Sequence, residues 1–221
     1  MTPLAAALMV FSMEMVSAFI SVLIGYYASK AHRASSARGL QFLYLGFAIL
    51  GIGIFLRAIT AIYLLIAFRV ADAVSSSLAG ISNLAGIIFT LTQLVAYSLF
   101  VATYAYQQRG QGEWGSKEGS TTAMAVFPIA RLFYIPTLEL VAIAMLGFVA
   151  FSSLVNWRHR QATNSALVFS GFSLMFLSHI LYLFMILSEN LLFYGQLTQL
   201  AGFVCLLIML VRVNGDNAKR A

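Results

Sequence analysis

Long apolar stretches separated by short polar clusters dominate the pattern of the chain. They predict six helices, at about 3–29, 39–66, 79–106, 127–156, 164–187 and 190–213. Each stretch approaches or exceeds the length of about 20 apolar residues that crosses a bilayer. We therefore expect an all-α integral membrane protein with six transmembrane helices. The first stretch is too long for the apolar core of a cleaved signal peptide and is expected to remain as a helix.

The polar, Gly-rich sequence QQRGQGEWGSKEGSTT occupies residues 107–122. Such a composition is typical of a linker. It divides the chain into a first three-helix unit at 1–106 and a second at 123–221, which ends in a short basic tail.

The two units resemble each other. A shift of 125 positions brings together residue types that are rare in apolar helices: Pro3 with Pro128, Glu14 with Glu139, and Arg33 with Arg158. The tetrapeptide LTQL occurs at 91–94 and again at 197–200, a shift of 106. The two shifts differ by 125 − 106 = 19, which places an insertion in the first unit near residues 71–77. A tandem duplication is the interpretation that we favour.

An odd number of helices in each unit has a geometric consequence. If the linker stays on one side of the membrane, the second unit enters from the side opposite to the first. We therefore expect two inverted three-helix repeats (3+3), related by an axis in the membrane plane as in many transporters. Under this arrangement five Lys and Arg residues lie on one side and six on the other, so the positive-inside rule leaves the orientation open.

Composition agrees with a membrane protein. Of the 221 residues, 61% are hydrophobic and 9% are charged, whereas soluble domains carry about 25% charged residues. The net charge of +6 comes mostly from residues beside apolar segments, where Lys and Arg fix topology and contact lipid head groups. The expected partner is thus the lipid bilayer and no nucleic acid, and the expected location is the cell membrane, crossed several times.

Four ionisable residues fall within the predicted spans: Glu14, Arg57, Glu139 and His179. Such residues are costly in a bilayer and are functional candidates by default. Glu14 and Arg57 lie at similar depth, so we expect them to pair. Glu139 is expected to meet His179 or Tyr182, and Tyr182 occupies the position equivalent to Arg57.

These two pairs differ in chemistry. A His–Glu pair can titrate near neutral pH, whereas arginine stays charged. One unit would then hold a fixed clamp and the other a protonatable site. The alternative is that both pairs only hold the helices together.

Uncharged polar residues add to the candidate pathway. Gln93, Gln196 and Gln199 are expected to point into the bundle. Gln93 and Gln199 occupy equivalent positions, so in inverted repeats they would face each other where a transporter binds its substrate. Interhelical hydrogen bonding is again the plainer explanation.

A transporter or channel for an ion or small solute is the preferred function. The alternatives are a non-catalytic anchor or accessory subunit of a larger membrane complex, or a sensory membrane module; a homo-oligomer is left open. No catalytic motif is present, so an enzyme is not favoured. Cys205 is the only cysteine, and no cofactor or metal is expected. A water-accessible cavity reaching the glutamates would favour transport, and a dry interior an accessory role.

Overall fold

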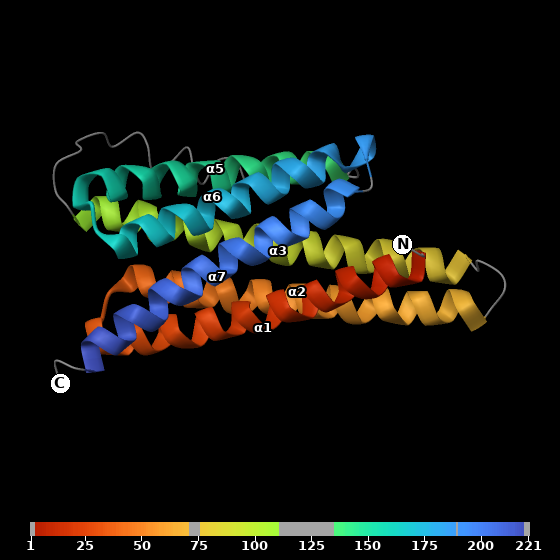
Figure 1. The fold of residues 1–221 in the computed structure, drawn as a ribbon, viewed down its shortest axis with the longest axis horizontal. Helices are drawn as coiled ribbons and strands as arrows, with labels where there is room; N and C mark the ends of the chain where they lie inside the picture. The colour runs from red at the N-terminus through yellow and green to blue at the C-terminus, as the bar shows by residue number, and fades with distance from the viewer. Residues whose placement is uncertain (1–2, 71–75, 111–134, 189, 219–221) are drawn as a thin grey trace.

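The computed structural model describes residues 3–70, 76–110, 135–188 and 190–218. Within them the chain is helical, as Figure 1 shows. The helices are α1 (Pro3–Ser35), α2 (Arg38–Val70), α3 (Ser76–Gly110), α5 (Ile135–Arg160), α6 (Thr163–Leu183) with the short 3-10 helix η1 (Phe184–Leu187), and α7 (Asn190–Ala218).

The helices match the six apolar stretches but extend beyond several of them. Residues 107–110, expected in the linker, form the end of α3. A helix continues past its apolar stretch because its backbone hydrogen bonds do not depend on apolar side chains. The rest of the predicted linker, the predicted start of the fourth helix at 127–134 and most of the predicted insertion lie outside the described residues.

All six long helices are suited to a membrane. Each contains a stretch of 21 to 28 residues that is long and apolar enough to cross one. Large apolar side chains point outward along them, for example Phe19 and Phe151, which are 65% and 66% exposed. Such a surface would be unfavourable in water and fits contact with lipid. The chain is therefore indicated to be a multi-pass membrane protein.

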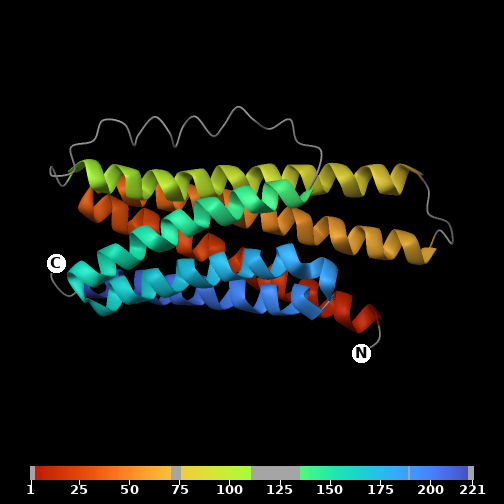
Figure 2. The ribbon, with the colours of Figure 1, turned by 90° about the horizontal axis from the view of Figure 1, so that it is seen from above.

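The six helices form a closed ring in the order α1, α2, α3, α5, α6, α7 and back to α1, each packing against two neighbours. Figure 2 shows the bundle from a second side. Four phenylalanines from different helices fill its interior, Phe47, Phe100, Phe172 and Phe203. Their ring centroids lie 4.6 Å (Phe47–Phe100), 6.0 Å (Phe47–Phe203) and 5.6 Å (Phe100–Phe172) apart. We call these four residues the aromatic plug.

The two units run in the same direction, and the expectation of inverted repeats is wrong in this respect. On α1 and α7, Glu14 contacts Gln196 and Tyr27 contacts Asn214, so both sequences advance together. Figures 1 and 2 show that α1, α3, α5 and α7 all begin at one end of the bundle, whereas α2 and α6 begin at the other.

The expectation failed because it assumed that α3 and α5 are joined at one end. The end of α3 and the start of α5 lie at opposite ends of the bundle. The 24 residues between them are enough for such a distance, since even a helical rise of about 1.5 Å per residue would cover ~36 Å.

Local geometry repeats with the same shifts as the sequence. The turns after α1 and α5 place Ser36 and Gln161, 125 positions apart, in the left-handed region with φ of 54° and 46°. The backbone N–H of each donates over 2.7 Å to the carbonyl four residues earlier. Residues other than glycine rarely adopt this conformation, so its presence at two equivalent positions supports a common origin of the units.

Close helix packing repeats as well. A Cβ on Gly46 would lie 2.5 Å from the Phe100 ring and 3.1 Å from a backbone oxygen of α3. A Cβ on Gly171 would lie 2.6 Å from Leu206 and 3.1 Å from the equivalent oxygen of α7. Gly171 lies 125 positions after Gly46, and the residues of α7 that it contacts lie 106 positions after those of α3 that Gly46 contacts. Glycine allows both helix pairs to approach closely.

Candidate intramembrane polar site

All eight polar residues singled out from the sequence make side-chain hydrogen bonds inside the ring, in three neighbouring groups. They are Glu14, Arg57, Gln93, Glu139, His179, Tyr182, Gln196 and Gln199, and Tyr97 joins them. We call these nine residues the polar layer. It is built by side chains of every one of the six long helices.

The first part of the layer is an ion pair. Arg57 Nη2 donates to Glu14 Oε1 over 2.6 Å, which confirms the predicted pair. Gln196 Nε2 donates to the same oxygen over 3.2 Å. The Arg57 guanidinium also lies 4.0 Å from the centroid of the Phe89 ring, a favourable cation–π arrangement.

The ion pair is largely removed from solvent. The side chain of Glu14 is 7% exposed and that of Arg57 is 29% exposed. Their mutual ion pair, the Gln196 hydrogen bond and the Phe89 ring compensate the two charges. An uncompensated charge inside a protein would be costly. Arg57 Nε is buried with no hydrogen-bond partner in the described part of the chain.

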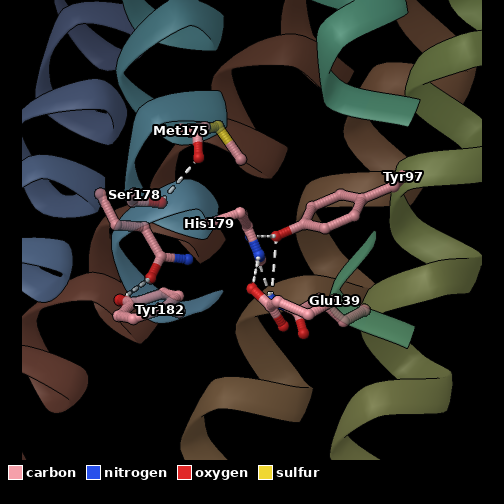
Figure 3. A network of polar contacts seen from close by, with 8 residues as sticks. Tyr97, Glu139, Met175, Ser178, His179 and Tyr182 are labelled. Atoms are coloured by element: carbon pink, nitrogen blue, oxygen red, sulfur yellow. Dashed lines mark hydrogen bonds and ion pairs between the residues drawn. The ribbon is translucent and has the colours of Figure 1, made fainter. Parts of the chain in front are cut away.

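The second part is centred on His179, whose side chain is fully buried. Figure 3 shows the imidazole between Glu139 of α5 and Tyr97 of α3. His179 Nδ1 contacts Glu139 Oε1, and Nε2 lies 2.6 Å from the Tyr97 hydroxyl. The predicted Glu139–His179 contact is therefore confirmed. Gln93 Nε2 lies 2.9 Å from the Tyr97 oxygen.

One pattern of protons satisfies these contacts with a neutral imidazole. Gln93 donates to the Tyr97 oxygen, the Tyr97 hydroxyl donates to Nε2 of His179, and Nδ1–H donates to the Glu139 carboxylate. If His179 gains a proton, Nε2 becomes a donor. The Tyr97 hydroxyl must then turn away, and the Gln93 amide must present its oxygen to it.

Tyr182 forms a third part of the layer with Gln199 and contacts the second part. Its hydroxyl donates to Gln199 Oε1 over 2.8 Å, and its ring lies edge-on to His179 with centroids 5.6 Å apart. The ring crosses α7 directly over Gly195, where any Cβ would collide with it. Tyr182 occupies the position equivalent to Arg57, and Gly195 the position equivalent to Phe89. The first unit packs a guanidinium against an aromatic ring at this place, whereas the second unit packs an aromatic ring against a glycine.

Gln93 and Gln199, expected to face each other, form no hydrogen bond with each other in the described part of the chain. Each bonds within its own part of the layer, Gln93 to Tyr97 and Gln199 to Tyr182. Tyr97 was missed because tyrosine is common in membrane helices. Its position four residues after Gln93 on α3 was the available signal, since residues four apart share a helix face.

No metal site is indicated in the described ranges, which hold no group of three or more His, Cys, Asp or Glu side chains close enough to bind an ion. A surface hollow lined by Ala162, Thr163, Asn164 and Arg212 lies at the opposite end of α6 from His179. It therefore does not reach the polar layer. No known protein family, curated protein or solved structure matches the chain, so its function has to be inferred from the polar layer itself.

Proposed function

We propose that the protein is a proton-coupled transporter or channel, with the Glu139–His179 pair as its proton site. The observation that carries this is the place of His179. It is fully buried between a carboxylate and a phenol that come from two other helices. Imidazole is the side chain whose unperturbed charge changes between pH 5 and 8. Buried His–Glu chains are typical of proton relays in membranes.

Protonation would act on three helices together. The reversal of donors at Tyr97 and Gln93 changes the contacts of α3, while the Glu139 contact ties α5 to α6. A charge on His179 is also felt by its charged and titratable neighbours, which are Glu139, Tyr97 and Tyr182, with Arg57 and Glu14 beyond them. One proton can therefore alter how the helices of the two units pack.

The Glu14–Arg57 pair has a different part in this proposal. Arginine keeps its charge at any pH the protein meets, so the pair cannot carry a proton through its guanidinium. It joins α1 to α2, and through Gln196 to α7. We assign it to holding one side of the ring while the Glu139–His179 side changes.

The architecture that goes with this function is a pair of parallel repeats. The common helix directions, the repeated turn geometry at Ser36 and Gln161 and the repeated glycine contacts all support it. The axis relating the units would run along the membrane normal, as it does between the halves of some transporter folds.

Proton flux into liposomes tests the proposal. Purified protein is reconstituted with a pH-sensitive dye inside, and a pH gradient is imposed between pH 5 and 8. We expect flux from the native protein and from His159→Gln, the matched control, because His159 lies on the exposed end of α5. His179→Gln and Glu139→Gln should lose it. Absence of flux from the native protein over this range, with several cations and a membrane potential, would refute transport.

A sensory or accessory role is the second candidate. The close packing of the aromatic plug favours it, since all four rings are buried with their centroids 4.6 to 6.0 Å apart in the pairs that touch. A pH-dependent change in helix packing, without flux, would point to this role. The same liposomes can be measured by circular dichroism and by protease sensitivity to distinguish the two.

A further inference from the structure

The basic residues of the described helices gather at one end of the bundle. Because the units run in parallel, the ends of α1, α3, α5 and α7 and the start of α2 lie together. Seven basic residues belong to this end: Lys30, Arg33, Arg38, Arg109, Arg158, Arg160 and Arg212. At the other end the described helices contribute Arg69. We call the first the basic end.

This distribution orients the protein. Lys and Arg residues near membrane segments are concentrated on the cytoplasmic side. For these same eight residues of the described helices, the inverted arrangement would give four on each side, whereas the parallel arrangement gives seven against one. By this rule we assign the basic end to the cytoplasmic side and the start of α1 to the opposite side.

The polar layer is far from the basic end. Glu14 precedes Lys30, Gln93 precedes Arg109, and Gln196 precedes Arg212, each by 16 residues. At about 1.5 Å per residue this is ~24 Å of a hydrocarbon core about 30 Å thick. The layer thus lies in the non-cytoplasmic third of the membrane rather than at its centre.

The aromatic plug lies between the layer and the cytoplasm. Phe47 follows Arg38, Phe100 precedes Arg109, and Phe203 precedes Arg212, each by nine residues, or ~14 Å. Phe172 likewise follows the first residue of α6 by nine. The four rings are at most 1% exposed. They form a closed apolar layer on the basic side of the polar layer.

Glu139 provides the contact with the other side. Its side chain is 18% exposed, whereas that of His179 is buried completely. Glu139 is the fifth residue of α5, so it lies close to the non-cytoplasmic end of that helix. A proton can reach the imidazole through this carboxylate without passing the plug.

Resting on the proposed function, we infer that the Glu139–His179 site exchanges its proton with the non-cytoplasmic compartment and is closed to the cytoplasm in this conformation. The protein would then respond to the acidity outside the cytoplasm. The charged and titratable groups around the site are those named above, Glu14 and Arg57 included, and they lie at the same depth.

Cysteine labelling tests the orientation on which this depends. In a Cys205→Ala background, single cysteines replace Ser36, Gln161 and Ser188, and intact cells are treated with a membrane-impermeant maleimide. We expect labelling of Ser188→Cys from outside, whereas Ser36→Cys and Gln161→Cys react only after the cells are opened. Labelling of Ser36→Cys and Gln161→Cys from opposite sides would overturn the parallel arrangement and the inference.

Imidazole NMR tests the sidedness of the proton. His32→Gln/His159→Gln protein leaves His179 as the only histidine, and its nitrogen signals are followed in oriented liposomes with separately buffered compartments. We expect the signals to follow the pH on the side of Ser188. Signals that follow the side of Ser36 overturn the inference but leave the proposed function standing. Signals that follow neither side between pH 5 and 8 overturn both.

Discussion

Replacing Arg57 with leucine tests whether the polar layer stabilises the bundle. The change removes the guanidinium from Glu14, whose side chain is only 7% exposed. Breaking a buried ion pair by removing one partner costs about 3–5 kcal/mol, since the remaining charge is uncompensated. The lost contact with the Phe89 ring adds about 0.5–2 kcal/mol.

Two features reduce this cost. The Arg57 side chain is 29% exposed, so solvent already screens part of its attraction to Glu14. Gln196 still donates one hydrogen bond to the carboxylate. We therefore expect the low end of the range, a loss of about 3 kcal/mol of unfolding free energy. For a chain of this size that corresponds to a fall of about 6–12 °C in Tm.

Thermal melts in detergent, followed by circular dichroism, measure the effect. Arg38→Leu is the control, because Arg38 is exposed and donates one bond to the exposed Tyr106 hydroxyl, a contact worth about 1 kcal/mol or less. The double change Glu14→Leu/Arg57→Leu removes both charges and should recover most of the loss. Our reasoning fails if Arg57→Leu melts like Arg38→Leu, or if the double change is no more stable than the single one.

Three further substitutions test the packing around the layer and the turns, each by its melting temperature in detergent. Ser36→Gly should raise Tm by about 2–4 °C, since it relieves roughly 1 kcal/mol of left-handed backbone strain; an unchanged or lower Tm contradicts this. Tyr97→Phe should lower stability by about 1–3 kcal/mol because the buried imidazole Nε2 loses its shorter hydrogen bond and keeps only the Gln93 amide, 3.3 Å away; a melt like that of the native protein would show that the Tyr97 bond is absent. Gly195→Ala should destabilise the bundle, because the added Cβ would push the Tyr182 ring aside. Gly86→Ala is the control: a Cβ there meets nothing within 4 Å and should stabilise the helix by up to about 1 kcal/mol. Equal effects of the two changes would contradict the contact between Gly195 and Tyr182.

Much of this protein could be predicted from one sequence because a bilayer restricts structure strongly. Backbone groups in lipid must bond within their own segment, so each long apolar stretch had to be a helix. Polar side chains in such helices must point inward and find partners. For this reason the eight residues chosen from the sequence all entered the polar layer, with Glu14 on Arg57 and Glu139 on His179.

The equivalence of the two units was also visible in the sequence, in the shift of 125 positions marked by Pro3, Glu14 and Arg33. The same shift relates Ser36 to Gln161 in the turns and Gly46 to Gly171 between helices.

Only the tertiary structure decided the direction of the second unit. A sequence pattern fixes which segments cross a membrane, but the direction of a crossing depends on where the preceding segment ends. The end of α3 and the start of α5 lie at opposite ends of the bundle, and contacts between helices, such as Tyr97 with His179 and Glu14 with Gln196, hold this arrangement. Direction in turn decides which charges lie together and from which side Glu139 is reached. The grouping of charges and the access to Glu139 depend on how helices pack against each other, so the sequence of a single helix does not contain them.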